Sequence, residues 1–112
     1  MSTIKLKTFT LRTENDGWLG QIIISSDGMF SAVTDYGNLS YAWRSTGYDF
    51  RDFLLRLSVD YFGSKLQNGL SYIAYTKKTS QACNRFAEKI LPELQRVIKE
   101  DLINDKFWQT NG

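Results

Sequence analysis

Carboxylate pairs are the residues of this sequence that could do general acid–base chemistry. They are Asp49 with Asp52, Glu100 with Asp101, and Asp35 in a turn. Such catalysis requires two carboxylates that converge in a cleft and have shifted pKa values. Each of these residues is more simply a helix cap or a solvated helix position. The carboxylates by themselves therefore do not indicate an active site.

Other catalytic and metal-binding chemistry lacks its usual residues. The chain has no histidine, and Cys83 is its one cysteine. An imidazole base, a Cys–His pair and zinc sites built from these residues are therefore missing. No Gly-rich phosphate loop, nucleophile elbow or EF-hand spacing occurs. We predict a protein that is not an enzyme and needs no cofactor or metal, with Cys83 a small buried hydrophobic residue.

Basic residues gather around the start of the last predicted helix. They are Lys77, Lys78, Arg85 and Lys89. Clustered cations can bind phosphates, so a small nucleic-acid-binding protein is the alternative function. Glu88 and Glu93 dilute this charge, and no helix-turn-helix, RNP or KH signature accompanies it. A solvated helix face is the simpler interpretation of these charges.

Length and composition describe an ordinary globular chain. It has 112 residues, 42% hydrophobic and 23% charged, and a formal net charge of +2. This length favours a single domain, 1–112, and the charge is too small to direct the whole molecule to nucleic acid or anionic lipid. A single cysteine excludes an intrachain disulfide. With no signal-like or membrane-spanning apolar run, we expect a cytoplasmic protein without a membrane partner.

The first half of the chain has the pattern of an antiparallel meander. Strands are predicted over 3–12, 18–25, 29–36 and 39–45, where β-branched and aromatic residues alternate with polar ones. Asp27-Gly28 and Gly37-Asn38 are predicted as the central residues of two-residue hairpin turns. These turns fix which strand residues share a face of the sheet.

One face of this sheet is predicted to form the core beneath the helices. Its members are Leu19, Ile23, Phe30, Ala32, Tyr36, Leu39, Tyr41 and Trp43. The opposite face would then be more apolar than solvent favours, which suggests that another chain covers it. The predicted partner-binding residues there are Trp18, Ile22, Ile24, Met29 and Val33, with Arg44 at the rim. A slipped register, or a face edged by long Lys and Arg side chains, is the competing interpretation.

The second half of the chain has helical spacing. Asp49 is predicted to cap one helix over 50–66, with a stripe of Phe50, Phe53, Leu54, Leu57 and Tyr61 facing the sheet. A fifth strand is plausible over 70–76. Thr79 or Ser80 could cap a last helix from about Gln81, with a stripe of Ala82, Phe86, Ile90, Leu94, Val97 and Leu102. Pro92 must kink or split that helix. Phe107 and Trp108 could fold back onto the sheet or anchor a partner.

The predicted fold is α+β, with two layers: a four- to five-stranded, mainly antiparallel sheet and two helices on one of its faces. The segments GMFSAVTDYGNLSYAWRSTGYDFRDFLLRLSVDYFGSKL and QACNRFAEKILPEL resemble small accessory proteins of bacteriophages and prophages of Gram-negative bacteria. The resemblance covers most of residues 17–98. That group has no established activity, so no functional residues carry over from it.

The resemblance implies a phage accessory product. Small phage proteins often bind and block a host protein, including CRISPR–Cas or other defence machinery, and such an inhibitor needs a surface more than a reaction centre. We therefore expect a non-enzymatic protein that binds a host protein, as an anti-CRISPR-like inhibitor of bacterial defence. A homodimer is a further way to cover the apolar face of the sheet.

Overall fold

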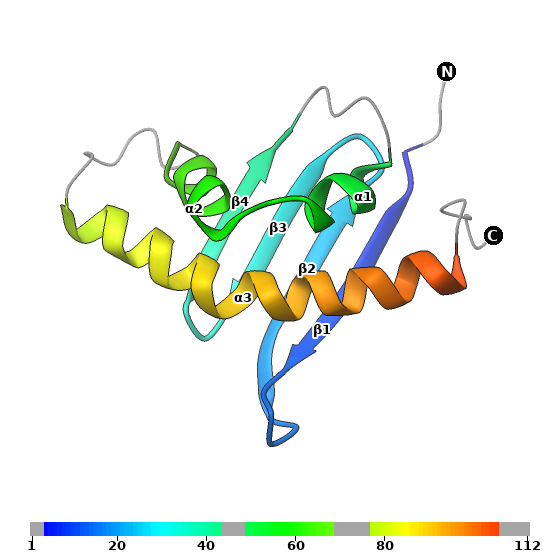
Figure 1. The fold of residues 1–112 in the computed structure, drawn as a ribbon, viewed down its shortest axis with the longest axis horizontal. Coiled ribbons are helices and arrows are strands. Elements are labelled where there is room, and N and C mark those ends of the chain that lie inside the picture. The colour runs from blue at the N-terminus through cyan, green and yellow to red at the C-terminus, as the bar shows by residue number, and fades with distance from the viewer. Residues whose placement is uncertain (1–3, 44–48, 69–76, 106–112) are drawn as a thin grey trace.

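Four strands and three helices make up the computed structural model, which describes residues 4–43, 49–68 and 77–105. The strands are β1 (Leu6–Arg12), β2 (Trp18–Ser25), β3 (Met29–Thr34) and β4 (Gly37–Ala42), paired antiparallel in the order β1-β2-β3-β4. The helices α1 (Phe50–Leu55), α2 (Val59–Asn68) and α3 (Lys77–Asn104) all lie against one face of the sheet (Figure 1). The predicted two-layer α+β fold and four-stranded meander are confirmed.

The turn between β2 and β3 is one residue longer than predicted. Ile24 pairs with Phe30, so three residues, Ser26 to Gly28, form the loop. Gly28 has φ +98° and donates a hydrogen bond to the Ser25 carbonyl at 3.1 Å. A turn followed by a left-handed glycine is the usual form of a three-residue hairpin loop. The predicted two-residue turn is therefore wrong.

This single residue reverses the faces predicted for β2, because side chains alternate along a strand. Ile22 and Ile24 are 0% exposed and pack under the helices, whereas Ile23 is 43% exposed on the opposite face. The two-residue turn predicts the reverse for all three residues, and this prediction is wrong. Leu19 is nevertheless buried as predicted, because it is skipped by the β1 ladder: Leu11 pairs with Gly20 and Arg12 with Trp18.

The second turn is also displaced, but without consequence for the faces. Thr34 pairs with Gly37, so Asp35 and Tyr36 are the central residues in place of Gly37-Asn38. The turn moves by two residues, an even number, and β3 and β4 keep their predicted faces. The core residues predicted for this hairpin are confirmed as buried or packed against the core: Phe30, Ala32, Tyr36, Leu39, Tyr41 and Trp43.

The helix predicted over 50–66 is two helices. Asp49 caps α1 as predicted and accepts a hydrogen bond from the Arg51 amide at 2.9 Å. Ser58 accepts from the Tyr61 amide at 3.1 Å and starts α2. The change of axis leaves Tyr61 40% exposed, so its predicted place on the buried stripe is wrong.

A glutamine of α3 holds the junction between α1 and α2. The Gln95 side-chain amide donates to the carbonyls of Leu54, Leu55 and Leu57 at 3.0, 3.3 and 3.0 Å. The last carbonyls of a helix lack partners in the next turn, and Gln95 supplies a donor to these three, although the Leu54 carbonyl also accepts from the Leu57 amide at 3.3 Å. A residue about forty positions away in the sequence therefore provides hydrogen bonds at the junction where the predicted helix is interrupted.

The last helix begins earlier than predicted, at Lys77, so Thr79 and Ser80 lie inside it. It continues through Pro92 to Asn104, and its axis bends near the middle without a split (Figure 1). Phe86, Ile90 and Leu94 are buried and Val97 and Leu102 are partly buried, as predicted; Ala82 is exposed. Cys83 is buried, which confirms the prediction, and burial raises the pKa of its thiol.

An aromatic cluster joins the layers. The ring centroids of Phe30 and Phe62 are 5.3 Å apart, and Phe62 lies 6.3 Å from both Trp43 and Phe86. Phe62 of α2 thus contacts the sheet and α3 together, and the aromatic residues of β3 and β4 are structural. The predicted strand over 70–76, Phe107, Trp108 and Arg44 lie outside the described residues.

Candidate functional site

The face of the sheet opposite the helices is the candidate binding surface. We call it the open face, since no described helix packs against it (Figure 1). Its large apolar side chains are Leu6 (67% exposed), Trp18 (44%), Ile23 (43%), Met29 (56%) and Val33 (53%).

Strand pairing brings four of these side chains together around Ile23. Ile23 pairs with Thr8 of β1 and with Ser31 of β3. Leu6, Met29 and Val33 each lie two positions from one of those partners, which makes them diagonal neighbours of Ile23. They form a cluster of apolar side chains around Ile23, interspersed with polar ones. Trp18 lies beside Arg12 at the far end of the face.

The rest of the open face is polar but almost uncharged. Its remaining side chains are Thr8, Thr10, Arg12, Gln21, Ser31, Asn38, Ser40 and Ala42. Only Arg12 among them is charged, and it lies 3.8 Å from the Asp16 carboxylate. Depletion of charged residues is typical of the core of a protein interface.

Three of the predicted partner-binding residues lie on this face: Trp18, Met29 and Val33. Ile22 and Ile24 do not, because the three-residue loop turns them into the core, and Ile23 takes their place. Arg44 lies outside the described residues. Sequence reasoning missed Ile23 and Leu6. The signal for Ile23 was present at Gly28, since a glycine after Asp27 suits a three-residue loop as well as a two-residue one.

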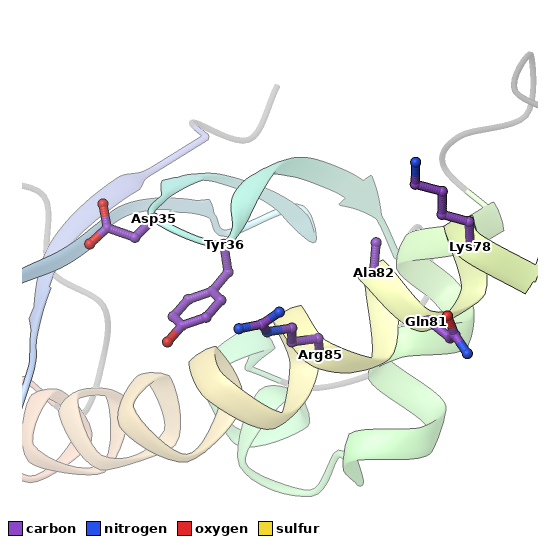
Figure 2. A pocket seen from close by; sticks show the side chains of 6 residues that line it. All are labelled: Asp35, Tyr36, Lys78, Gln81, Ala82 and Arg85. Carbon is purple, nitrogen blue, oxygen red and sulfur yellow. The ribbon is translucent and has the colours of Figure 1, made fainter.

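A second candidate surface lies where the β3–β4 turn approaches the start of α3. An open pocket of about 470 Å³ is lined by Asp35, Tyr36, Lys78, Gln81, Ala82 and Arg85 (Figure 2). The Arg85 guanidinium lies 5.6 Å from the centre of the Tyr36 ring, in a cation–π contact. The structure thus brings two of the predicted nucleic-acid-binding residues, Lys78 and Arg85, to one pocket.

An ionic cluster that the sequence did not indicate joins the end of α3 to β1 and α1. Arg51, which is 0% exposed, lies 2.7 Å from Asp49 and 2.8 Å from Asp101. The Lys7 ammonium lies 3.0 Å from Asp101 and 2.7 Å from Asp105. The predicted solvated position of Asp101 is therefore wrong: this carboxylate bridges both cations.

Two opposing effects act on the cations of this cluster. Burial lowers the pKa of Arg51, but its hydrogen bonds to Asp49 and Asp101 outweigh burial and raise that pKa overall. The pKa of Lys7 is raised in the same way by Asp105 and Asp101. Both side chains therefore stay charged, and the cluster acts as a structural tie between elements distant in the sequence.

Among residues 4–43, 49–68 and 77–105, no group of three or more His, Cys, Asp or Glu side chains is placed to hold a metal ion. Within the same ranges, no helix is long and apolar enough to cross a membrane.

Comparison with known proteins gives a family. A profile described as a phage family matches residues 1–85, which include the whole sheet, α1, α2 and the first part of α3. No curated protein and no solved structure gives a significant match. Because the profile covers well over half of the chain, this protein belongs to that phage family.

Proposed function

We propose that this phage protein is a non-enzymatic accessory protein that binds a host protein through its open face. The observation that carries the proposal is the exposed cluster of Leu6, Ile23, Met29 and Val33, diagonal neighbours on a face with almost no charge. Apolar side chains left exposed together favour association, because burying them removes their surface from water.

The mixed composition of the open face favours a partner other than a second copy. Interfaces of obligate homodimers are more apolar than those of proteins that also exist alone. Here threonine, serine and asparagine side chains lie between the apolar ones, so the free protein can remain dissolved before it meets its partner. A homodimer on this face would appear as a doubled mass in light scattering.

For the partner, we propose a defence protein of a Gram-negative host, met in the host cytoplasm and inhibited by the bound phage protein. An anti-CRISPR-like inhibitor acts by covering a functional surface of its target, which requires a docking face and no reaction centre. The family membership supports a phage origin. The exposed apolar side chains of the open face support docking there.

Site-specific photo-crosslinking in infected host cells tests the proposal. A crosslinking residue replaces Ser31, which pairs with Ile23 at the middle of the open face. The matched control carries the same residue in place of Lys99, an exposed position of α3 on the other side of the molecule. We expect a host protein crosslinked from Ser31 and absent from Lys99. Equal products from the two positions, or none from Ser31, would contradict the proposal.

Inhibition has its own readout. Expression of the protein in a host with active defence should raise the plating efficiency of a sensitive phage, and Ile23→Asp should remove this protection. A control variant, Ile103→Asp, changes an isoleucine of α3 that is more exposed than Ile23, 68% against 43%, and should protect as the wild type does. Protection that persists with Ile23→Asp would overturn the role of the open face.

A further inference from the structure

The first part of α3 carries more positive than negative charge. Between Lys77 and Leu91 it holds four basic residues and one acidic residue, Glu88. Lys78, Arg85 and Lys89 recur at spacings of seven and four, so they share one face of the helix. We call these three residues the basic stripe. None of them has an ion pair within the described part of the chain.

This arrangement runs against the helix dipole. The first turn of α3 has no acidic residue and its last turn no basic one, although the dipole favours the reverse. At the C-terminal end the discrepancy is compensated, because Asp101 pairs with Lys7 and Arg51. At the N-terminal end the described structure provides no comparable partner for the basic stripe. An anionic partner from outside the chain would supply the missing compensation.

The pocket beside the stripe adds an aromatic ring and a hydrogen-bond acceptor. Tyr36 reaches toward α3 and lies against Arg85, and Asp35 lies at the other side of the pocket (Figure 2). A base can stack on a tyrosine ring or a guanidinium plane. The Asp35 carboxylate can accept hydrogen bonds from the exocyclic amino group of a base, as carboxylates do from cytosine. A simple phosphate would use none of these features.

We propose that the basic stripe and this pocket form a second site, on the opposite side of the sheet from the open face, that binds single-stranded nucleic acid. The cations of the stripe bind successive phosphates, while an unstacked base enters the pocket between Tyr36 and Asp35. Lys78 and Lys89 are separated by about 16 Å along the helix, which is more than a single nucleotide needs. Bases held in a duplex could not reach the ring, so a single strand fits best.

Fluorescence anisotropy with a labelled twelve-nucleotide strand tests this proposal. Binding should weaken as salt rises, and should weaken at least about tenfold in Lys78→Ala/Lys89→Ala, two exposed positions whose change leaves the core intact. Lys99→Ala removes one positive charge from the other half of α3 and should stay within about twofold of the wild type. Equal losses in Lys99→Ala, or no binding at low salt, would overturn the site.

Further arms separate the possible ligands. Tyr36→Leu should weaken binding and Tyr36→Phe should not, because the phenylalanine ring still stacks. The affinities for a DNA strand and an RNA strand of the same sequence show which of the two nucleic acids the site prefers. Tighter binding of a duplex or of an acidic peptide than of the single strand would contradict the proposal. Ile23→Asp should bind the strand normally, so failure here leaves the open-face proposal untouched and the reverse also holds.

Discussion

Arg51 and Asp101 are fifty residues apart in the chain, yet the Arg51 guanidinium donates to an Asp101 oxygen at 2.8 Å. The contact ties the start of α1 to the end of α3. Asp101 also accepts from Lys7 of β1 at 3.0 Å, so one carboxylate holds three elements together. With Arg51 fully buried, this cluster is sensitive to the loss of any partner.

Replacing Arg51 should therefore destabilise the fold strongly. Arg51→Met keeps most of the side-chain volume but leaves Asp49 and Asp101 without their guanidinium, and we expect a loss of about 3 kcal/mol in the free energy of unfolding. Arg96→Met is the matched control, since Arg96 pairs with Glu93 and Glu100 on the exposed surface, where an ion pair contributes little, and it should cost much less than Arg51→Met. Urea denaturation measures both, and equal losses would show that the cluster is not a structural tie.

The burial of Cys83 should make the stability of the fold depend on pH in the alkaline range. Burial raises the pKa of its thiol above the ordinary value of 9.0, so the folded protein holds the proton more tightly than the unfolded chain. The free energy of unfolding therefore includes the full contribution of the protonated thiol below pH 9.0, and this contribution is lost as pH rises further. The raised pKa of Lys7 makes stability depend on pH only above pH 10.5, so it does not affect this range.

Urea midpoints of the wild type and Cys83→Ala between pH 7.5 and 10 test this sign. The wild type should lose stability relative to the variant above pH 9, because only the wild type must bury an ionisable thiol. Parallel curves across the range would mean that the thiol remains accessible in the folded state.

Gly28 should tolerate no side chain. Its φ of +98° is unfavourable for other residues, and a Cβ would lie 1.9 Å from the Trp43 carbonyl oxygen. We expect Gly28→Ala to cost at least about 2 kcal/mol. Gly37→Ala is the control, because Gly37 also has a positive φ but has open space around it, and about 1 kcal/mol is expected. Thermal melts followed by circular dichroism compare the two, and a larger loss at Gly37 would contradict the loop geometry.

Two adjacent isoleucines of β2 should lose very different amounts of stability in the same substitution. Ile22→Asp buries an unpaired carboxylate under the helices and should prevent folding, a loss above about 4 kcal/mol. Ile23→Asp places the carboxylate on the open face and should cost about 1 kcal/mol, mainly through weaker strand propensity. Circular dichroism and amide dispersion in NMR spectra distinguish the outcomes. If Ile22→Asp were folded and Ile23→Asp unfolded, the result would contradict the three-residue loop and support the two-residue turn.

The pattern of the sequence was sufficient for the layers and the strand order, and not for the register of β2. Alternation identifies strands, and turn residues separate them, so the meander followed directly. Register depends on the number of residues in each loop, and Asp27-Gly28 fits two loop lengths. The choice is made by tertiary contacts: Gly28 accepts a hydrogen bond from the Trp43 amide at 2.8 Å, beyond the end of β4.

Long-range polar contacts explain the other differences. The break between α1 and α2 depends on Gln95, and the burial of Arg51 depends on Asp101. Neither pairing is visible in local periodicity, because the partners are far apart in sequence. The open face was anticipated as an apolar surface with Trp18, Met29 and Val33, but its central residue, Ile23, could be found only once the register of β2 was known.

The affinity of Ile23→Asp for the crosslinked host protein tests the central claim most directly. Isothermal titration calorimetry compares this variant with the wild type and with Ile103→Asp, all three confirmed as folded. A residue at the centre of the docking surface should weaken binding at least about 30-fold, the equivalent of about 2 kcal/mol, whereas Ile103→Asp should bind as the wild type does. Wild-type affinity in Ile23→Asp would contradict docking through the open face.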